Sequence, residues 1–395
     1  PQGDGNFGGV QYEIINQSEY PVYVNDKEVP VGEVAMTIQT IHAIQAEDGI
    51  WATTGKDALP YGSYTIREIA GNDSYNKAEW SQDFEIRSDE QMVTFGTPEN
   101  WNEDEVKRGG IEITKADADT GISTPQGDAE LANTSYDIYN RSENKVYVNG
   151  AWYAKDDKIM TVETEWNETR NAYVASTGER VLPYGTYEIV ETGAPDGYHK
   201  ADYKQTVQIR QDGEIVQLKD AASNYNVDEV FRGGVSITKA DADWHTSEPQ
   251  GDATLAGNEY QIINRSQNAV FMRESMKSYA PGEAVMTLKT EWNEEKQAYV
   301  ASTAKSSLPY GTYEIVETKA AEGYNNAEWS ATFTIRQEGE MHYFDRTEEG
   351  TSGPNSEYVF HHQWNENEVM RGGIIVGKVD RETGQYLSLG EAHLD

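Results

Sequence analysis

The sequence predicts an all-β protein built as an elongated array of tandem immunoglobulin-like β-sandwich domains. Three observations predict this class: domain-sized repeats, short alternating apolar segments between turn residues, and 25 tyrosines against 8 phenylalanines. Tyrosine, valine, isoleucine and threonine favour pleated strands, and long amphipathic helical patterns are absent from the sequence. A chain of 395 residues accommodates about two to four such domains.

The repeats are marked by the motif RGG, which begins at Arg108, Arg232 and Arg371, at intervals of 124 and 139 residues. These spacings are those of domains rather than of solenoid turns. We therefore divide the chain into repeat one (1–107), repeat two (108–231), repeat three (232–370) and the first strand of a further repeat (371–395). The extra length of repeat three falls in residues 339–365, where a Gly/Ser/Asn-rich stretch predicts a longer hairpin or loop.

Within each repeat, short alternating segments are separated by turn residues. Repeat two shows YDIYN, KVYVN, IMTVET and LPYGTYEI in this order, with close counterparts in the other repeats. Several short strands at such spacing are typical of a β-sandwich. We expect Tyr136 and Ile138 to face inward and Asn140 to begin a turn.

The two ends of the chain differ from its middle. Pro1 aligns with Pro125, so repeat one lacks the RGG strand, whereas residues 371–384 read as an opening strand with no domain behind it. We expect the sequence to be a window of a longer array. A second possibility is that the C-terminal strand of one molecule completes repeat one of another by strand addition.

Three polar positions fall on predicted buried faces. Lys115 lies two residues after Ile113 on the RGG strand, and Glu191 follows Tyr187 and Ile189 with the same period of two. An Asp or Asn precedes each RGG motif on the last strand, with an Asn two residues earlier as an alternative. The complete set is the lysines Lys115, Lys239 and Lys378, the glutamates Glu68, Glu191 and Glu317, the leading acceptors Asp104, Asp228 and Asn367, and the alternative acceptors Asn102, Asn226 and Asn365.

A lysine, a glutamate and an Asn or Asp that meet in a core have the groups needed to form an amide bond. Burying an ammonium group is costly, and a desolvated lysine loses its proton more readily and becomes a nucleophile. A buried carboxyl group has a raised pKa, so it can polarise an Asn or Asp side chain and carry protons to the leaving group. The expected product is an isopeptide bond between the first and last strands of a repeat.

The composition argues against several other classes of function. A net charge of -36 disfavours nucleic acids and anionic membranes as partners, and no segment has the length of a transmembrane helix or the pattern of a signal peptide. Asp117 and Asp119 could supply oxygen ligands to calcium, but a solvated turn is the expected role because no full loop pattern appears. The scattered histidines predict no metal site, and no cofactor or turnover catalysis is expected.

Trp166 and Trp292 occupy equivalent places in the motif TEWNE. An exposed indole can stack on a sugar, but we expect these residues to hold a loop.

The segments ITKADADTG, PQGDATLAGNEYQI and LPYGTYEIVETGAPDGY resemble the B-type, prealbumin-like (SpaA/CnaB-type) domains of Gram-positive collagen adhesins, pilins and surface proteins. This resemblance covers essentially the whole chain. It implies sandwiches that are each locked by a self-generated Lys–Asn or Lys–Asp bond, with the glutamate of the last motif as catalyst. Carried over, Lys115 pairs with Asp228 under Glu191, and Lys239 pairs with Asn367 under Glu317.

The resemblance implies stalk repeats of an adhesin or pilus-like fibre on the bacterial cell surface, in contact with neighbouring repeats and anchored to the cell wall through a region outside this sequence. Two other functions remain open. One is an extracellular module that binds a host protein or glycan, and the other is a strand-swapped intermolecular fibre joined through the strand that carries Lys378.

Overall fold

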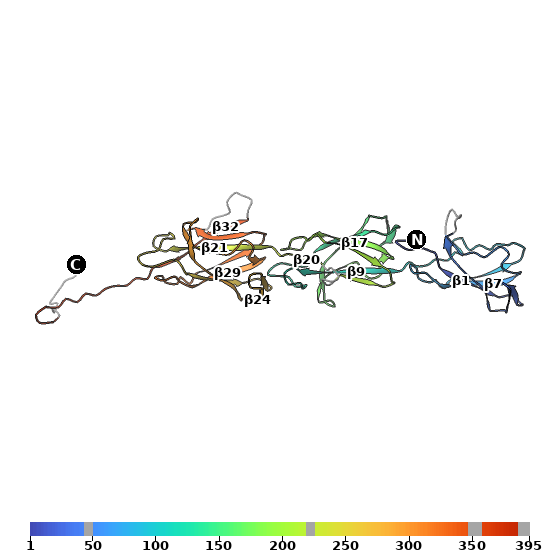
Figure 1. The fold of residues 1–395 in the computed structure, drawn as a ribbon, viewed down its shortest axis with the longest axis horizontal. Helices are drawn as coiled ribbons and strands as arrows, with labels where there is room; N and C mark the ends of the chain where they lie inside the picture. Colours follow the sequence, from blue (N-terminus) through green and yellow to red (C-terminus); the bar gives the residue numbers. More distant parts are fainter. Residues whose placement is uncertain (43–49, 219–225, 347–357, 386–395) are drawn as a thin grey trace. The chain divides into compact units, whose positions relative to one another are not determined.

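The computed structural model describes residues 1–42, 50–218, 226–346 and 358–385, which form strands and turns and contain no helix. Figure 1 shows the strands of the three repeats. The chain divides into two compact units, residues 1–231 and 232–395. The predicted all-β class is confirmed.

The strands recur in the same order in each repeat. Repeat one contains β1 (Gln11–Asn16), β2 (Val22–Val24), β3 (Lys27–Val29), β4 (Val34–Gln39), β5 (Ile41–His42), β6 (Ile50–Trp51), β7 (Gly62–Ala70) and β8 (Ser81–Ile86). Repeat two contains β9 (Arg108–Asp117), β10 (Ser135–Asn140), β11 (Val146–Val148), β12 (Ala151–Tyr153), β13 (Lys158–Glu163), β14 (Glu165–Asn167), β15 (Ala172–Ser176), β16 (Leu182–Pro183), β17 (Gly185–Gly193), β18 (Lys204–Ile209), β19 (Ile215–Leu218) and β20 (Asn226–Asp228). Repeat three contains β21 (Arg232–Asp241), β22 (Glu259–Asn264), β23 (Val270–Met272), β24 (Lys277–Tyr279), β25 (Ala284–Lys289), β26 (Glu291–Asn293), β27 (Ala298–Ser302), β28 (Leu308–Pro309), β29 (Gly311–Lys319), β30 (Ser330–Ile335), β31 (Met341–Arg346), β32 (Val359–Gln363) and β33 (Asn365–Asn367).

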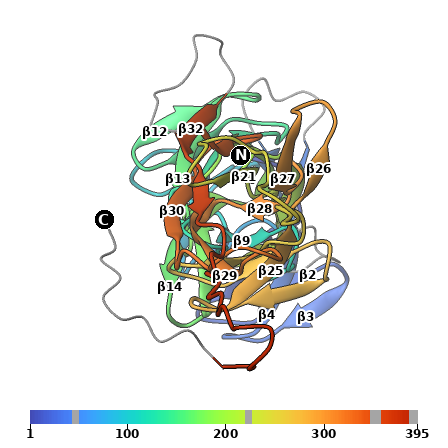
Figure 2. The same ribbon diagram turned by 90° about the vertical axis from the view of Figure 1, so that its left-hand side faces the viewer.

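One sheet has the same four-stranded antiparallel topology in all three repeats. Its strand order is β4-β1-β7-β8 in repeat one, β13-β10-β17-β18 in repeat two and β25-β22-β29-β30 in repeat three. A short hairpin such as β2–β3 accompanies each sheet. In Figure 2, β25 and β29 lie on one side of repeat three and β21 and β27 on the other.

The RGG strand organises the second sheet in repeats two and three. β9 pairs antiparallel with β15 and β16 and parallel with β19 and β20. β21 has the corresponding partners β27, β28, β31 and β33. The first and last strands of each repeat are therefore adjacent and parallel.

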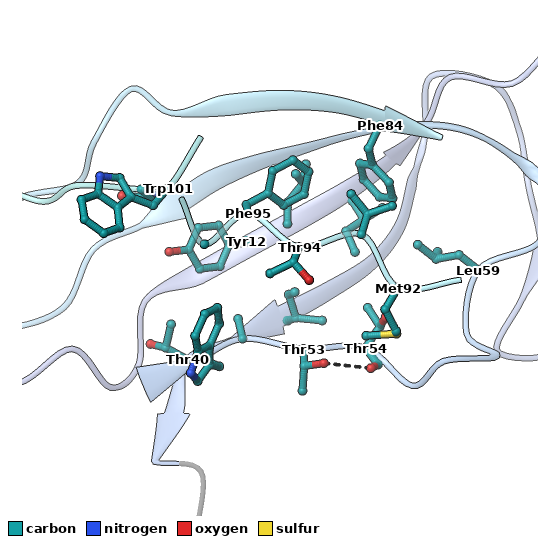
Figure 3. A pocket seen from close by; sticks show the side chains of 18 of the residues that line it. Tyr12, Thr40, Thr53, Thr54, Leu59, Phe84, Met92, Thr94, Phe95 and Trp101 are labelled. Carbon is teal, nitrogen blue, oxygen red and sulfur yellow. Dashed lines mark hydrogen bonds between the residues drawn. The ribbon is translucent and has the colours of Figure 1, made fainter. Parts of the chain in front are cut away.

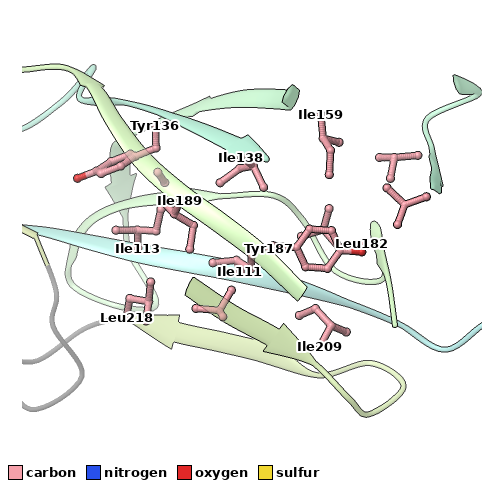
Figure 4. Close-up of a cluster of buried hydrophobic side chains, with 14 residues drawn as sticks. Ile111, Ile113, Tyr136, Ile138, Ile159, Leu182, Tyr187, Ile189, Ile209 and Leu218 are labelled. Carbon is pink, nitrogen blue, oxygen red and sulfur yellow. The ribbon is translucent and has the colours of Figure 1, made fainter. Parts of the chain in front are cut away.

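The core of repeat two lies between these sheets. Ile111 and Ile113 of β9 face Tyr136, Ile138 and Ile189 of the other sheet, as Figure 4 shows. Tyr136 and Ile138 are fully buried, as their alternation predicts. Asn140 ends β10 and its side chain accepts a hydrogen bond from the backbone of Ser142, which confirms the predicted turn.

Repeat three adds a strand at the edge of its second sheet. β32 pairs parallel with β31, so these two segments are not the arms of an antiparallel hairpin. The connecting residues 347–357 lie outside the described part of the chain.

Two segments of repeat one differ from their counterparts in repeat two. Residues 92–95 and 102–104 align with β19 and β20, but they form no strand. A strand in a sheet requires a hydrogen-bonded neighbour, and no strand among residues 1–42 and 50–107 takes the place of β9 beside them.

The glycines of the RGG motif are explained by close packing. A Cβ atom added to Gly233 would lie 2.5 Å from the carbonyl oxygen of Glu340 and 2.7 Å from Cδ1 of Ile335. Gly109 is enclosed in the same way by Glu214 and Ile209, whereas Gly372 has no neighbour within 4 Å of such an atom.

Replacing Gly233 by alanine should therefore destabilise repeat three by about 1–3 kcal/mol, because the added methyl group meets backbone and a well-packed isoleucine. Thermal unfolding of the whole chain measures the effect. Gly372→Ala is the matched control and should leave the melting of repeat three unchanged. Equal melting of the two variants would contradict the packing explanation.

Candidate cross-linking site

Strand register brings the predicted lysines, glutamates and amides together in repeats two and three. Lys115 on β9 lies opposite Asn226 on β20, and Tyr136 on β10 lies opposite Glu191 on β17. Repeat three has the same arrangement. There, Lys239 lies opposite Asn365 and Tyr260 lies opposite Glu317.

Both lysines are completely removed from solvent. The side chains of Lys115 and Lys239 are 0 % exposed, as are those of Glu191 and Glu317. Burial disfavours a charged amine, so desolvation lowers the pKa of Lys239 to about 7 and also lowers the pKa of Lys115. A neutral amine is therefore accessible to Lys239 near neutral pH, and burial shifts the pKa of Lys115 in the same direction.

In repeat two, the Lys115 amine is surrounded by three side-chain groups. Nζ contacts Oδ1 of Asn226, lies 2.5 Å from Oδ1 of Asp228 and lies 3.3 Å from Oε2 of Glu191. The hydroxyl of Tyr136 donates a hydrogen bond of 2.9 Å to the same Oδ1 of Asn226. The amide is thus held by the nucleophile on one side and by a hydrogen-bond donor on the other.

Repeat three repeats this geometry with different neighbours. Nζ of Lys239 contacts Oδ1 of Asn365 and lies 3.5 Å from Oε1 of Glu317, and the Tyr260 hydroxyl donates to Asn365 Oδ1 at 2.8 Å. The amide of Asn367 donates to Oε1 of Glu317 at 2.6 Å, and Asn258 donates to the same oxygen at 2.8 Å.

The acid groups of repeat two favour their protonated forms. Desolvation raises the pKa of Glu191 to about 7, although Lys115 opposes the change. Desolvation also raises the pKa of Asp228. Glu191 can therefore hold and release a proton near neutral pH, as a general acid–base requires.

The predicted acceptors occupy two different places. The alternatives Asn226 and Asn365 stand directly opposite the lysines and receive the tyrosine hydrogen bond. The leading choices, Asp228 and Asn367, lie two residues further along the last strand and are also buried. Which of these side chains bonds to the lysine, and so loses its amide nitrogen or carboxyl oxygen, remains a prediction.

Sequence reasoning missed the role of the tyrosines. Tyr136 was assigned only to the core, yet its hydroxyl is directed at the amide. Tyr12, Tyr136 and Tyr260 begin the equivalent strand segments YEI, YDI and YQI. Their recurrence opposite Glu68, Glu191 and Glu317 was the signal that could have identified them.

Repeat one holds the acid and the acceptors without a lysine. The Asn102 amide donates to Oε2 of Glu68 at 2.6 Å. Oε1 of Glu68 and Oδ1 of Asp104 are buried without a hydrogen-bond partner. Desolvation, followed by the charge of Glu68, raises the pKa of Asp104 to about 7. Lys378 lies in the exposed residues 371–385.

The acidic turn after β9 is not solvated as expected. Asp117 is fully buried, and its carboxylate accepts hydrogen bonds from Gln126 Nε2, at 2.9 Å, and from the Tyr198 hydroxyl, at 3.0 Å. The backbone of Thr120 also donates to it, at 2.9 Å. Asp117 therefore fixes the end of the strand, which the solvated-turn prediction did not foresee.

The two tryptophans pack on neighbouring tyrosines. Trp166 meets Tyr173, and Trp292 meets Tyr299, edge to face at ring-centroid distances of 5.3 Å and 5.2 Å. Each pair joins adjacent strands, in agreement with the expected structural role.

Two further features are absent from the part of the chain that the structure describes, residues 1–42, 50–218, 226–346 and 358–385. They contain no cluster of three or more His, Cys, Asp or Glu side chains arranged to bind a metal ion. In the same part of the chain, no helix has the length and apolar character needed to cross a membrane.

The sandwich topology and the buried Lys–Glu–Asn clusters define a class of tandem prealbumin-like domains. The chain belongs to the SpaA family of prealbumin-like fold domains, whose model matches residues 109–222 and 233–348, more than half of the sequence. Both matched segments begin at the glycine that follows an RGG arginine.

Two solved structures from Bacillus species are among those similar to the chain. The Bacillus anthracis TIE protein shares 23% identity at a TM-score of 0.50, over 91% of this chain and 48% of that one. The present chain thus spans about half of that protein. BcpA, the major pilin subunit of Bacillus cereus, shares 13% identity at a TM-score of 0.26, over 93% of this chain and 97% of that one. No curated protein sequence matches significantly.

The acid pair of repeat one predicts a pH-dependent stability. Because the folded-state pKa of Asp104, about 7, exceeds its ordinary value of 3.8, the folded state binds more protons than the unfolded state between these values. Repeat one should therefore be most stable in acid and lose stability as the pH rises from about 4 to 7. Hydrogen exchange of β1 and β7 amides, corrected for intrinsic rates, measures this dependence.

Asp104→Asn removes the titrating group and should flatten the pH dependence. Asp89→Asn, at an exposed position, should retain it. An unchanged slope in Asp104→Asn would show that another group is responsible.

Proposed function

We propose that repeats two and three are structural stalk domains, each locked by an intramolecular isopeptide bond between its first and last strands. Lys115 joins Asn226 in repeat two, and Lys239 joins Asn365 in repeat three. The observation that carries this proposal is the contact of each buried Nζ with the amide oxygen of an asparagine, beside a buried glutamate.

The reaction needs only the groups present in each cluster. The neutral Nζ of Lys115 attacks Cγ of Asn226, and the charge that develops on Oδ1 is stabilised by the Tyr136 hydroxyl. Protonated Glu191 gives a proton to the amide nitrogen, which leaves as ammonia, and regains one from the attacking amine. One C–N bond forms, one breaks, and Glu191 ends as it began.

Proximity supports Asn226 and Asn365 over Asp228 and Asn367 as acceptors. A reaction between two groups held in contact avoids most of the entropy cost of bringing them together. Only the two nearer asparagines also receive a hydrogen bond from tyrosine at the oxygen that becomes negatively charged. An Asp228 acceptor would lose water instead of ammonia, which distinguishes the two products by mass.

The bond has a mechanical consequence within each domain. The first and last strands are adjacent and parallel, so they carry tension applied to the two ends of a repeat. A covalent bond between them passes this tension through the side chains, without loading the core or the hydrogen bonds of the sheets. Such domains are suited to a stalk.

We further propose that the stalk is part of an adhesin or pilus-like fibre outside a Gram-positive cell. Its partners would be neighbouring repeats and other subunits of the same fibre. Membership of the SpaA family of prealbumin-like fold domains supports this role. Binding of host proteins or glycans would belong to other regions of the whole protein.

The masses of two variants test the assignment in repeat three. The mass of the wild-type chain should be lower than the mass calculated from its sequence by two molecules of ammonia, one for each complete repeat. The mass of Asn365→Ala should be lower by only one. Asn367→Ala is the matched control and should still lack two. Intact-mass measurement of the denatured chain, followed by peptide mapping, gives the count.

Loss of the bond should also destabilise repeat three. The bond joins Lys239 and Asn365, which lie 126 positions apart in the sequence. Closing a loop of this length stabilises a domain by roughly 5 kcal/mol in the chain-entropy model. Asn365→Ala should therefore melt at a lower temperature than Asn367→Ala. Two ammonia losses in Asn365→Ala would make Asn367 the acceptor, and an unmodified wild-type mass would reject the cross-link altogether.

A further inference from the structure

We propose that residues 2–4 form a coupling turn, which docks on repeat two and holds repeats one and two in a single orientation. Both repeats belong to the compact unit of residues 1–231. The turn is part of the motif PQGD, which recurs at residues 125–128 and 249–252. This role goes beyond the locking of single domains and does not depend on the isopeptide bonds.

The coupling turn places a carboxylate in a site built by repeat two. Oδ2 of Asp4 accepts hydrogen bonds from the Thr186 hydroxyl at 2.6 Å and from Nη2 of Arg210 at 2.9 Å. Oδ1 of Asp4 accepts a hydrogen bond from the backbone nitrogen of Glu143 at 3.0 Å. Hydrogen bonds to an ionised group are stronger than those between neutral groups, so repeat two binds both oxygens of this carboxylate firmly.

The backbone of the coupling turn is bound as well. The nitrogen of Gly3 donates to the carbonyl of Lys145 at 3.2 Å, and the carbonyl of Gly3 accepts from the backbone and the side chain of Asn144, both at 2.9 Å. The nitrogen of Asp4 donates to the carbonyl of Tyr184 at 3.1 Å. The contact is therefore a docked segment and not an isolated surface ion pair, which would contribute little.

Glycine is required at the centre of the coupling turn for two reasons. Gly3 has a φ of +58°, in the left-handed region that disfavours other residues. A Cβ atom added to Gly3 would also overlap the carbonyl oxygen of Tyr184 in repeat two. The turn thus has the conformation and the size that close approach to the next repeat demands.

The coupling turn is tied to the body of repeat one. The backbone nitrogen of Gln2 donates to the hydroxyl of Tyr75, a buried residue, at 2.9 Å. The backbone nitrogen of Asn6 donates to the hydroxyl of Ser74 at 3.1 Å, and the side chain of Asn72 donates to the carbonyl of Asn6 at 2.6 Å. A force on the docked turn therefore reaches the fold of repeat one.

The covalent linker provides a second attachment between the two repeats. The backbone nitrogen of Tyr184 donates to the carbonyl of Lys107 at 2.7 Å, and Nη2 of Arg108 donates to the carbonyl of Tyr147 at 3.0 Å. Domains joined only by a linker normally move relative to one another. Attachment through both the linker and the turn restricts bending about the linker, which a stalk requires.

Repeat two forms the carboxylate site from its own residues. The guanidinium carbon of Arg210 lies 4.8 Å from the ring centroid of Tyr184, and its Nη2 donates to Oγ1 of Thr186 at 3.2 Å. The residues at these positions of repeat three are Arg336, Tyr310 and Thr312. They have the same geometry, at 4.8 Å and 3.1 Å. Such preorganisation lowers the entropy cost of docking a carboxylate.

The coupling turn is separate from the apolar interior of repeat one. Figure 3 shows Tyr12, Phe84 and Phe95 around a cavity of about 650 Å³ in this repeat. None of residues 1–9 belongs to its lining. Substitutions in the turn therefore leave the side chains around this cavity unchanged.

Two spin labels measure the orientation of the repeats. The chain has no cysteine, so Gln39→Cys in β4 and Glu165→Cys in β14, both at exposed positions, label one site in each repeat. Double electron–electron resonance should give one narrow distance distribution. Asp4→Ala should convert it into a broad one, because it removes three hydrogen bonds to repeat two. The matched control Asp252→Ala, at the exposed equivalent position of repeat three, should leave it narrow.

A pair of glycine variants separates docking from backbone strain. Gly3 and Gly251 have φ angles of +58° and +56°, so alanine is equally strained at the two positions. A Cβ atom added to Gly251 would have no neighbour within 4 Å. Only Gly3→Ala should broaden the distance distribution. Equal broadening by both variants would contradict the docked turn.

A narrow distribution in both Asp4→Ala and Gly3→Ala would overturn the proposal, because the linker alone would then fix the orientation. A broad distribution in the chain without these two substitutions would overturn it as well. Hydrogen exchange of β1 and β7 amides should be unchanged in both variants. Faster exchange with a narrow distribution would make the turn a part of the fold of repeat one and reject its coupling role.

The test of the junction is independent of the test of the cross-links. The intact mass of Asp4→Ala should still be lower than the calculated mass by two molecules of ammonia. An unmodified mass with a narrow distribution in the labelled chain and a broad one in Asp4→Ala would reject the isopeptide bonds and support the coupling turn.

Discussion

The interior position of one lysine determines the chemistry of each complete repeat. An ammonium group in an apolar core is expensive, and the neighbouring acids of Lys115 only partly compensate for its desolvation. Forming an amide removes both the charge and the need to desolvate it. The same burial that makes the unreacted cluster unfavourable also makes the amine nucleophilic, so the cost of the buried lysine favours the proposed reaction, which would eliminate it.

The strand that carries this lysine is also the centre of the second sheet. β9 contacts four other strands, and its two RGG glycines allow the neighbouring backbone to approach closely. In the described part of repeat one no strand takes the place of β9, and the segments equivalent to β19 and β20 form no strand there. Fold and chemistry therefore depend on the same ten residues, Arg108–Asp117.

Repetition and period-two alternation were sufficient to predict the all-β class and the inward direction of Lys115, Glu191 and Tyr136. They could not choose between Asn226 and Asp228, because residues two apart face the same side of a strand. That choice depends on the register between β9 and β20. These are the first and last strands of repeat two, so most of the repeat separates them along the chain. The buried state of Asp117 was also missed, since its partner Tyr198 is 81 residues away along the chain.

Repeats two and three reach a reactive cluster by different charge arrangements. Repeat two places two acids, Glu191 and Asp228, beside Lys115, so one can balance an ammonium while the other holds a proton, and the pKa of Glu191 is raised to about 7. Repeat three replaces the second acid by Asn367, which donates to Glu317. Desolvation lowers the pKa of Lys239 to about 7, and one acid fewer is present to oppose this change. In both arrangements, burial moves the pKa of the lysine toward the neutral amine, with a buried carboxyl group beside it. The proposed amide formation is therefore compatible with an Asp or an Asn at this position.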